Sequence, residues 1–341
     1  MNNIFQDKTI LVTGGTGSIG SVVVSKLLEH HPKQIRVLSR DENKQYYLTQ
    51  KLNYPQNLRL LIGDIRDQDR INMAMEKVDI VIHTAALKHV PLCEYNPFEA
   101  IKTNIIGSQN VISAALKNNV KKVIAVSTDK AANPINIMGV SKLMMEKVFI
   151  NANYYTAAHE TTFACVRLGN VLWSNGSVLN LWKQQVDMHN TIHITGRGMT
   201  RFFISKDQAV DLILKAATAS QRGEIFILKM PAVKMSDLAR QFISKYFPNR
   251  RIKIEIKPSR PGEKIHEDLF DQSDLQKTIL ENKEMFIVAP NFHIYHQISN
   301  IEPAKNQSNS YHNFKSASRS NIHKYYSSRT CANSSFIKKI I

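Results

Sequence analysis

The segment Thr13-Gly14-Gly15-Thr16-Gly17-Ser18-Ile19-Gly20 decides the fold. It directly follows the β-branched run KTILVT (8–13) and opens an apolar stretch with helical spacing (19–30). In a loop of this kind Gly14 permits the tight turn, Gly17 lets the backbone approach a pyrophosphate, and Gly20 lets helix and strand pack closely. The first N–H groups of the helix then favour phosphate. The segment therefore predicts a dinucleotide-binding loop whose contacts are Gly14, Thr16, Gly17, Ser18, Ile19 and Gly20.

Short apolar runs alternate with amphipathic stretches through the first half of the chain. We expect strands at 8–13, 34–39, 58–63, 78–85, 121–128 and 161–168, and helices within 19–30, 98–118 and 139–152. Near-continuous apolar strands are typical of a sheet that is buried on both faces. The alternation predicts an α/β fold, namely a Rossmann-type doubly wound parallel sheet with a smaller C-terminal substrate lobe.

Composition divides the chain into three parts. Residues 1–170 carry the alternating pattern and are expected to form an NAD(P)-binding domain. In residues 171–302 glycines and prolines interrupt shorter elements, which predicts a nucleotide-sugar-binding lobe partly interleaved with the first domain. Residues 303–341 are basic, rich in Ser and Asn and without acidic residues, so we expect a disordered tail. Its last residues, SSFIKKII, could dock as a short element.

The overall composition excludes several classes of protein. Hydrophobic residues make up 43% and charged residues 21%, as in soluble globular proteins. Three scattered cysteines without CxxC spacing exclude a disulfide framework and a cysteine zinc site, and they fit a reducing cytoplasm. No His, Asp or Glu spacing predicts a metal site. We also expect no membrane span, because no apolar run approaches about 18 residues.

The net charge of +17 is not concentrated in one block. Seven Lys and Arg residues follow Glu302 with no acidic residue among them, so the first 302 residues carry +10 (17 − 7). That excess is spread along the chain without the basic stripe typical of nucleic-acid binders. We therefore expect no nucleic-acid partner. A moderately basic body suits a substrate that carries two phosphates.

The end of the second predicted strand reads Leu38-Ser39-Arg40-Asp41. An acidic residue there would hold the ribose diol of NAD, whereas Ser39 and Arg40 would hold the extra phosphate of NADP. Arg40 precedes Asp41, which favours NADP and leaves NAD possible. Asp64 and Ile65, after the third predicted strand, are placed to flank the adenine.

Further motifs follow the glycine loop in order. HTAAL (83–87), Asn104, Ser127-Thr128 and Lys142 resemble the extended short-chain dehydrogenase/reductase family. A closer resemblance is to its CapD-like polysaccharide-biosynthesis branch, carried by AALKHVP (85–91), KTNIIGSQNV (102–111), STDKAANPIN (127–136), MGVSK (138–142), RLGNV (167–171), MTRFF (199–203) and RPGEK (260–264). This branch includes the UDP-N-acetylglucosamine 4,6-dehydratases of capsule and lipopolysaccharide synthesis. The resemblance spans about residues 5–290 and implies a UDP-sugar substrate, a homo-oligomer, and cofactor contacts at Ala85, Ala86 and Lys142.

The sequence departs from the wider family at Met138. There a Tyr four residues before the Lys accepts the proton of the sugar hydroxyl that is oxidised, which a thioether cannot do. Dehydratases that also invert C5 form a subset of the branch with Met at this position, so the resemblance implies a subtype. Thr128 would bind the C4 oxygen and share the work of the missing Tyr through Lys142.

The pair Asp129-Lys130 distinguishes dehydration from simple epimerisation. After oxidation at C4 the C5 proton becomes acidic and water must leave from C6, which requires a base over C5 and an acid beside the C6 hydroxyl. The resemblance implies that Lys130 is this base and Asp129 this acid. A 4-epimerase needs neither.

The resemblance also implies substrate contacts on both sides of the cleft. These are Lys88, Asn104, Asn170, Arg201, Arg260 and Glu263. Arginine suits the diphosphate because its planar fork reaches two phosphate oxygens at once. Asn175 stands where relatives usually carry Arg.

The sequence is compatible with three functions. The leading hypothesis is a UDP-N-acetylglucosamine 4,6-dehydratase with C5 inversion. The second is a UDP-glucose 4-epimerase that interconverts UDP-galactose and UDP-glucose, which Met138 and Asp129-Lys130 oppose. The third is a non-catalytic NADP-binding protein, which the intact Asp129, Lys130 and Lys142 oppose. We expect a cytoplasmic location for any of the three.

Overall fold

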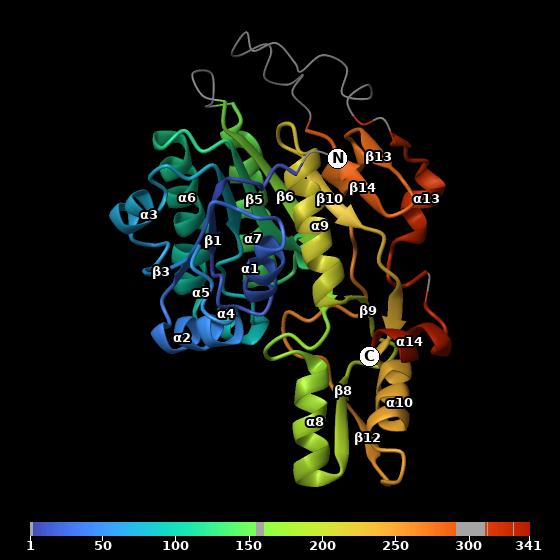
Figure 1. The fold of residues 1–341 in the computed structure, drawn as a ribbon. Coiled ribbons are helices and arrows are strands. Elements are labelled where there is room, and N and C mark those ends of the chain that lie inside the picture. Colours follow the sequence, from blue (N-terminus) through green and yellow to red (C-terminus); the bar gives the residue numbers. More distant parts are fainter. Residues whose placement is uncertain (1–2, 155–159, 291–310, 312, 330) are drawn as a thin grey trace.

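The computed structural model describes residues 3–154, 160–290, 311, 313–329 and 331–341 (Figure 1). All six predicted strands form, at β1 (Thr9–Thr13), β2 (Gln34–Ser39), β3 (Leu58–Ile62), β4 (Ile80–His83), β5 (Lys122–Thr128) and β6 (Thr162–Leu168). Together with β10 (Ile225–Leu228) they run parallel in the order β10-β6-β5-β4-β1-β2-β3. The predicted doubly wound parallel sheet is therefore confirmed.

Antiparallel strands extend this sheet on the β10 side. They are β14 (Met285–Val288), β13 (Ile279–Glu281) and β15 (Lys315–Ser316), in that order outward. Strands from the second and third parts of the sequence thus complete the sheet of the first part. The interleaving that the sequence predicted is more extensive than a boundary near residue 170 suggests.

Helices cover both faces of the sheet (Figure 1). Helices α1 (Gly20–Leu28) and α9 (Lys206–Ala219) pack against each other on one face, while α3 (Gln68–Ala74), α6 (Gly107–Lys117) and α7 (Ile137–Ala152) form a row on the other. Helix α2 (Glu42–Lys51) joins β2 to β3. Because both faces are covered, Ile10, Leu11 and Val12 of β1 are fully buried, which explains the apolar character of the strand.

A smaller lobe lies beyond one end of the strands, at the bottom of Figure 1. It contains α8 (Val178–His189), α10 (Met235–Tyr246) and the parallel pair β8 (Thr191–Thr195) and β12 (Lys253–Lys257). Strands β7 (Asn170–Val171), β9 (Thr200–Ile204) and β11 (Ala232–Lys234) form a small sheet between this lobe and the large one. The lobe has its own apolar cluster, in which Trp182 and Phe242 are fully buried. The short helix α11 (Gln272–Leu275) leads back to β13.

The prediction of a disordered tail at 303–341 is wrong for residues 311, 313–329 and 331–341. This segment contributes β15 to the large sheet and forms α13 (Arg319–Lys324) and α14 (Ser334–Ile340). Its few apolar side chains are enough because they are buried: Ile337 is fully covered within the cluster of the smaller lobe. SSFIKKII does dock, as α14. Residues 303–310, 312 and 330 lie outside the described part of the chain.

Candidate active site

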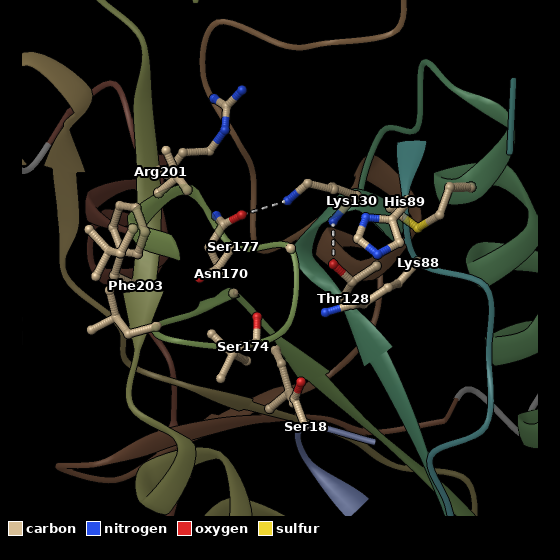
Figure 2. A pocket seen from close by; sticks show the side chains of 18 of the residues that line it. Ser18, Lys88, His89, Thr128, Lys130, Asn170, Ser174, Ser177, Arg201 and Phe203 are labelled. Carbon is tan, nitrogen blue, oxygen red and sulfur yellow. Dashed lines mark hydrogen bonds between the residues drawn. The ribbon is translucent and has the colours of Figure 1, made fainter. Parts of the chain in front are cut away.

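A cavity of about 580 Å³ lies between the carboxyl ends of the parallel strands and the smaller lobe (Figure 2). It opens where β1 has β2 on one side and β4 on the other, the switch point at which doubly wound sheets bind ligands. Most of the predicted site residues line it: Gly17, Ser18, Ile19, Gly20, Ala86, Lys88, Thr128, Lys130, Met138, Lys142, Asn170, Arg201, Arg260 and Glu263. The structure therefore brings these residues together around one cavity.

The glycine loop adopts the close packing that its sequence predicted. Gly14 has a φ of +68°, and a Cβ atom there would lie 2.7 Å from the Ala85 backbone. A Cβ atom on Gly20 would lie 2.4 Å from the Gly14 carbonyl oxygen. No side chain caps the start of α1, and Gly17 to Gly20 line the cavity. The uncapped helix start and the absence of side-chain bulk fit a dinucleotide pyrophosphate.

The predicted adenosine side lies around the end of β2. The hydroxyls of Thr16 and Ser39 are hydrogen-bonded at 2.7 Å. The Arg40 side chain is 56% exposed, with its Nη1 3.4 Å from Asp64 Oδ2. The Asp41 carboxylate instead caps α2 by accepting the Lys44 N–H at 2.9 Å. The Arg40 guanidinium is thus more exposed than the Asp41 side chain, which is 37% exposed and is engaged by Lys44.

The predicted adenine contact at Ile65 needs a correction. Its side chain is 4% exposed, within the main core, and it meets the α6 backbone at Gly107. Only the main chain of Ile65 is left to touch a ligand. The neighbouring Asp64 carboxylate lies 2.6 Å from Arg66 Nη2. Burial raises the pKa of Asp64, but hydrogen bonds from Arg66 outweigh this and lower it.

Lys142 is a buried lysine, and none of the carboxylates that the structure describes forms an ion pair with its ammonium group. It reaches the cavity from α7, which begins where the Asn136 side chain accepts the Gly139 N–H at 2.7 Å. Lys142 Nζ donates to the Val126 carbonyl at 2.9 Å and lies 3.4 Å from Met145 Sδ. Burial lowers the pKa of Lys142 to about 8. A substantial fraction of this amine is therefore neutral near physiological pH.

Met138 is part of the apolar wall beside Lys142. It is 4% exposed and belongs to a small cluster with Cys93 and Ala100. Because a thioether neither gives nor takes a proton under these conditions, Met138 contributes shape to the cavity and leaves acid–base work to its neighbours.

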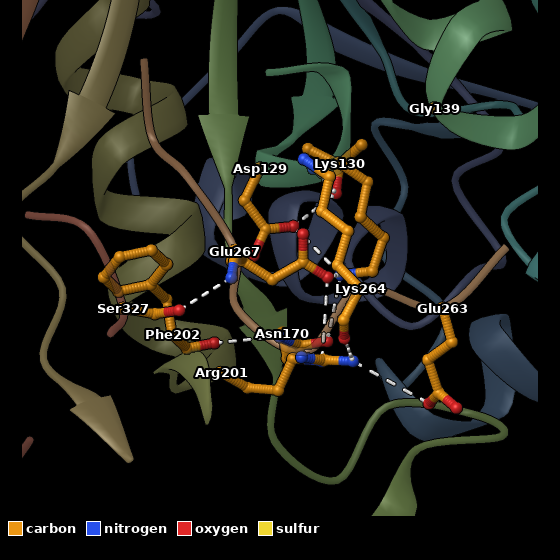
Figure 3. Close-up of polar contacts among 12 residues, drawn as sticks. Asp129, Lys130, Gly139, Asn170, Arg201, Phe202, Glu263, Lys264, Glu267 and Ser327 are labelled. Atoms are coloured by element: carbon orange, nitrogen blue, oxygen red, sulfur yellow. Dashed lines mark hydrogen bonds and ion pairs between the residues drawn. The ribbon is translucent and has the colours of Figure 1, made fainter. Parts of the chain in front are cut away.

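Lys130 is the centre of a charged network (Figure 3). Its Nζ lies 3.0 Å from Asp129 Oδ1, 3.3 Å from Asn170 Oδ1 and 3.5 Å from Glu267 Oε1. Burial lowers the pKa of Lys130, but the carboxylates of Asp129 and Glu267 outweigh burial, so that the pKa is raised. A Cβ atom on Gly139 would lie 2.4 Å from the Lys130 carbonyl oxygen, so α7 packs directly on this loop.

Asp129 does not line the cavity, which corrects the expected direct contact with the substrate. Its side chain is fully buried behind Thr128 and Lys130. The Oδ1 atom accepts from the Thr128 hydroxyl at 3.0 Å as well as from Lys130. The Oδ2 atom is buried and has no hydrogen-bond partner among the described residues. Any proton from Asp129 to the cavity therefore passes through Thr128 or Lys130.

Asn104 is also set back from the cavity, so its predicted role as a substrate contact needs correction. It lies in the π-helix Ile101–Ile106, between α5 (Pro97–Ala100) and α6, and is fully buried. Its amide donates to the Leu87 carbonyl at 3.0 Å and to Ser141 Oγ at 2.9 Å, and its oxygen accepts the Leu87 N–H at 2.8 Å. Asn104 thus holds the loop after β4 against α7.

Arg201 lines the cavity, but its guanidinium is already engaged with protein groups. It donates to the carbonyls of Thr200, Ile265 and Lys264 at 2.7 to 3.1 Å. In contrast, the Arg260 side chain is exposed at the cavity. Its backbone N–H donates to Glu263 Oε2 at 3.1 Å, which fixes the loop between them. Arg260 is therefore better placed than Arg201 to meet a phosphate.

The loop around Asn175 crosses the cavity entrance. Asn175 N–H donates to Ser18 Oγ at 2.8 Å, and Lys88 Nζ donates to the Asn175 carbonyl at 2.8 Å. The loop therefore joins the dinucleotide loop to the predicted substrate contact Lys88. It makes these bonds with its backbone, so the change from Arg to Asn at this position leaves them intact.

Glu267 and Ser327 belong to the site but were missed in the sequence. Glu267 is 2% exposed and Ser327 is fully buried. Glu267 lies three residues beyond RPGEK, which was the one available signal. Ser327 lies in the segment expected to be disordered.

Within the described residues, no three His, Cys, Asp or Glu side chains gather closely enough to hold a metal ion. None of the helices in that part of the chain is both long and apolar enough to cross a membrane.

Known proteins resemble this chain over most of its length. An inverting UDP-N-acetylglucosamine 4,6-dehydratase from Campylobacter jejuni is 44% identical over 84% of this chain and 84% of its own. A UDP-glucose 4-epimerase from Rickettsia bellii is 44% identical over 80% of this chain and 81% of its own. An uncharacterized membrane protein from Methanocaldococcus jannaschii is 48% identical over 85% of this chain and 88% of its own.

A solved structure and a family model extend the comparison. The X-ray structure of Pen from Bacillus thuringiensis has a TM-score of 0.88 and 38% identity, and the match covers 99% of this chain and 98% of that one. The model of the family described as polysaccharide biosynthesis protein matches residues 10–290. The chain therefore belongs to this polysaccharide biosynthesis protein family.

Proposed function

We propose that this protein is a UDP-N-acetylglucosamine 4,6-dehydratase that inverts C5 and acts in surface-polysaccharide synthesis in the cytoplasm. The observation that carries the proposal is Lys130 Nζ at the cavity, held between Asp129 and Asn170. The Campylobacter relative bears the name of this activity. A nucleotide-sugar enzyme of this family works through a transient 4-keto sugar.

The residues present fit a nicotinamide dinucleotide, which when bound would exchange a hydride with the sugar. Gly17 to Gly20 would hold its pyrophosphate, and Lys142 its nicotinamide ribose. We propose NADP as the preferred form, because Arg40 is turned to solvent while Asp41 is committed to capping α2.

Replacing Arg40 tests this preference. A hydrogen bond to a charged group contributes about 1.5–3 kcal/mol, so Arg40→Ala should weaken NADP binding by about 10- to 100-fold and leave NAD binding unchanged. Arg59→Ala, an exposed arginine on β3, is the matched control. Equal losses for both cofactors, measured by calorimetry, would argue against the assignment.

Oxidation at C4 requires a group that takes the hydroxyl proton. Thr128 lines the cavity, and we assign it the C4 oxygen. Lys142 accepts the proton, because its lowered pKa of about 8 makes part of it neutral. Met138 provides only the apolar wall.

Elimination then uses the second lysine. Lys130, in its neutral form, takes the C5 proton as the C5–C6 double bond forms and the C6 oxygen leaves as water. The Thr128 hydroxyl gives its proton to that oxygen and takes one in turn from Asp129, in its acid form, across their 3.0 Å contact. After hydride addition at C6, C5 takes a proton from solvent on the face opposite Lys130, which gives the inverted sugar.

We also propose a homo-oligomer built on the outer face of α4 (Val90–Tyr95), α5, the π-helix and α7. Large apolar side chains are exposed there, among them Tyr95, Phe98, Ile101 and Met144. A second copy of the chain would cover them. Light scattering should give a multiple of 38.8 kDa, and Phe98→Asp should reduce it to the monomer. A monomeric wild type would overturn this part of the proposal.

The second candidate function is a UDP-glucose 4-epimerase, because the Rickettsia relative bears that name. Such an enzyme oxidises C4 and returns hydride to the other face. In such an enzyme Asp129 and Lys130 would have no catalytic role.

Proton NMR of the purified protein with UDP-N-acetylglucosamine in deuterated water separates the two. A new C6 methyl signal with deuterium at C5 is the expected result. Interconversion of UDP-glucose and UDP-galactose without a methyl signal would instead establish the epimerase. No reaction with any of the three sugars would contradict both.

A further inference from the structure

Glu267 is a buried carboxylate that faces the proposed C5 base. Its Oε1 lies 3.5 Å from Lys130 Nζ and 3.6 Å from Arg201 Nε. Its Oε2 is buried, and no residue in the described part of the chain forms a hydrogen bond with it. Figure 3 shows the side chain between Asp129, Lys130 and Arg201. Burying a carboxylate costs free energy unless its oxygen atoms are paired or hydrogen-bonded. The burial of Glu267 beside Lys130 therefore indicates a role at this site.

The charges around the pair come from several elements. Asp129 and Lys130 stand on the turn after β5, Arg201 on β9, and Lys264 on the same segment as Glu267. Burial raises the pKa of Glu267 and Asp129 raises it further, whereas Lys130, Arg201 and Lys264 lower it; the result is a raised pKa. Two acids, Asp129 and Glu267, therefore lie in one small space with three cations, Lys130, Arg201 and Lys264.

Ser327 fixes the backbone of Glu267. Its Oγ accepts the Glu267 N–H at 2.7 Å, and its own N–H donates to the Glu267 carbonyl at 3.0 Å. The Thr200 hydroxyl donates to Ser327 Oγ at 2.8 Å. The next residues, Asp268 and Tyr326, form an antiparallel bridge. The C-terminal segment is thus paired directly with the strand-like stretch that carries Glu267.

The segment that carries Ser327 is itself anchored at both ends. On one side the Asn321 amide donates to Glu281 Oε1 of β13 at 2.9 Å. On the other side Ile337 and Ile341 are buried in the smaller lobe. Ser327 is therefore held from two parts of the molecule and transmits that restraint to Glu267.

We propose that Glu267 is a positioning residue for Lys130 and that Ser327, from the C-terminal segment, holds Glu267 in place. The proposal rests on the proposed function, in which Lys130 takes the C5 proton. When that proton arrives, a cation forms in a buried site, and the Glu267 carboxylate stabilises it. Glu267 thereby strengthens the base and fixes the position of its Nζ, without touching the sugar.

The first test measures Lys130 itself and needs no turnover. Nitrogen-15 NMR of lysine-labelled protein, with Lys130→Arg for assignment, gives the pKa of the Nζ. An opposite charge at this distance shifts a pKa by about 1–3 units, so Glu267→Gln should lower the pKa of Lys130 by about one unit or more. Ser327→Ala should also lower the pKa of Lys130, but by a smaller amount.

Two variants control for general disturbance. Glu281→Gln removes a buried carboxylate that also contacts the C-terminal segment, but far from Lys130. Ser318→Ala removes the N-cap of α13 and loosens the same segment without contact to Glu267. Both should leave the pKa of Lys130 unchanged.

The second test measures dehydration. On the high-pH plateau, where Lys130 is neutral in both proteins, Glu267→Gln should lower kcat by up to about tenfold with little change in KM, because a weaker base takes the C5 proton more slowly. The ascending limb of the pH profile should move to lower pH. Glu267→Asp, which restores the charge, should recover part of kcat. If Glu267 had only a structural role, Glu267→Gln would leave the pH profile unchanged. Glu267→Asp would then recover no more kcat than an uncharged residue does.

The outcomes separate this proposal from the proposed function. A Lys130 pKa that does not change in Glu267→Gln overturns the positioning role, and if that variant fails to fold, Ser327→Ala decides in the same way. A wild type that yields no methyl signal while Glu267→Gln still lowers the pKa overturns the dehydratase and leaves the positioning role standing.

Discussion

Two lysines line the same cavity and differ in charge state because of their neighbours. The ammonium group of Lys142 faces the Val126 carbonyl and the Met145 sulfur, and its pKa is lowered to about 8 by burial. Lys130 faces the Asp129 and Glu267 carboxylates, which outweigh burial and raise its pKa. Residue type and burial alone would have made them alike. Their partners therefore lower the pKa of Lys142 and raise that of Lys130.

The largest expected effect comes from removing the second of these lysines. Lys130→Gln should reduce dehydration by about 1,000- to 10,000-fold, because the proposed base for the C5 proton is lost. Thermal unfolding checks that the variant, which leaves Asp129 and Glu267 without their cation, still folds. A loss below about tenfold would mean that Lys130 is not the base.

Removing the acid should have a smaller effect. Asp129→Asn keeps the shape but ends proton delivery through Thr128, and we expect kcat to fall by about 100-fold. The variant should also lower the pKa of Lys130, because a carboxylate 3.0 Å away is lost. Steady-state kinetics and the NMR titration measure the two effects. An unchanged rate would exclude Asp129 as the source of the C6 proton.

The pH dependence of C4 oxidation should report Lys142. Its pKa is lowered from 10.5 to about 8, so the neutral form that accepts a proton appears as the pH rises through about 8. Below that value the rate should fall by about tenfold per pH unit and level off above it. Single-turnover absorbance of the reduced cofactor measures this, and Lys142→Gln should remove the dependence. A wild-type rate that is flat from about pH 6 to 9 would contradict the assignment.

The smallest effect is expected at Met138. A Met-to-Leu exchange in a packed apolar wall usually costs less than about 1.5 kcal/mol, so Met138→Leu should retain kcat within about threefold. Loss of activity in a variant whose stability is unchanged would give the thioether a direct part in catalysis.

Local causes explain what the sequence predicted well. The glycine loop, the six strands and the order of the cavity residues depend on spacing within short segments, and the structure brings them together as expected. A glycine is required at position 20, for instance, because a Cβ atom there would lie 2.4 Å from the Gly14 carbonyl oxygen. Such constraints are visible in a run of eight residues.

Contacts between distant segments explain what it did not. Glu267 and Ser327 reach Lys130 only through tertiary packing, 137 residues (267 − 130) and 197 residues (327 − 130) along the chain. Asp129 and Asn104 were identified as important, but their orientation away from the cavity depends on the packing of α7 and the loop after β4. The polar composition of the C-terminal segment predicts a disordered tail. A few buried side chains such as Ile337 are nevertheless enough to hold this segment against the rest of the protein.

Single-turnover formation of the reduced cofactor, followed in Lys130→Gln and Lys142→Gln with UDP-N-acetylglucosamine, tests the division of labour most directly. In Lys130→Gln we expect reduced cofactor to accumulate and the reaction to stop there, because oxidation at C4 proceeds and elimination does not. Lys142→Gln should form almost none. Absence of reduced cofactor in Lys130→Gln, or its accumulation in Lys142→Gln, would show that the two lysines do not have the separate roles assigned to them.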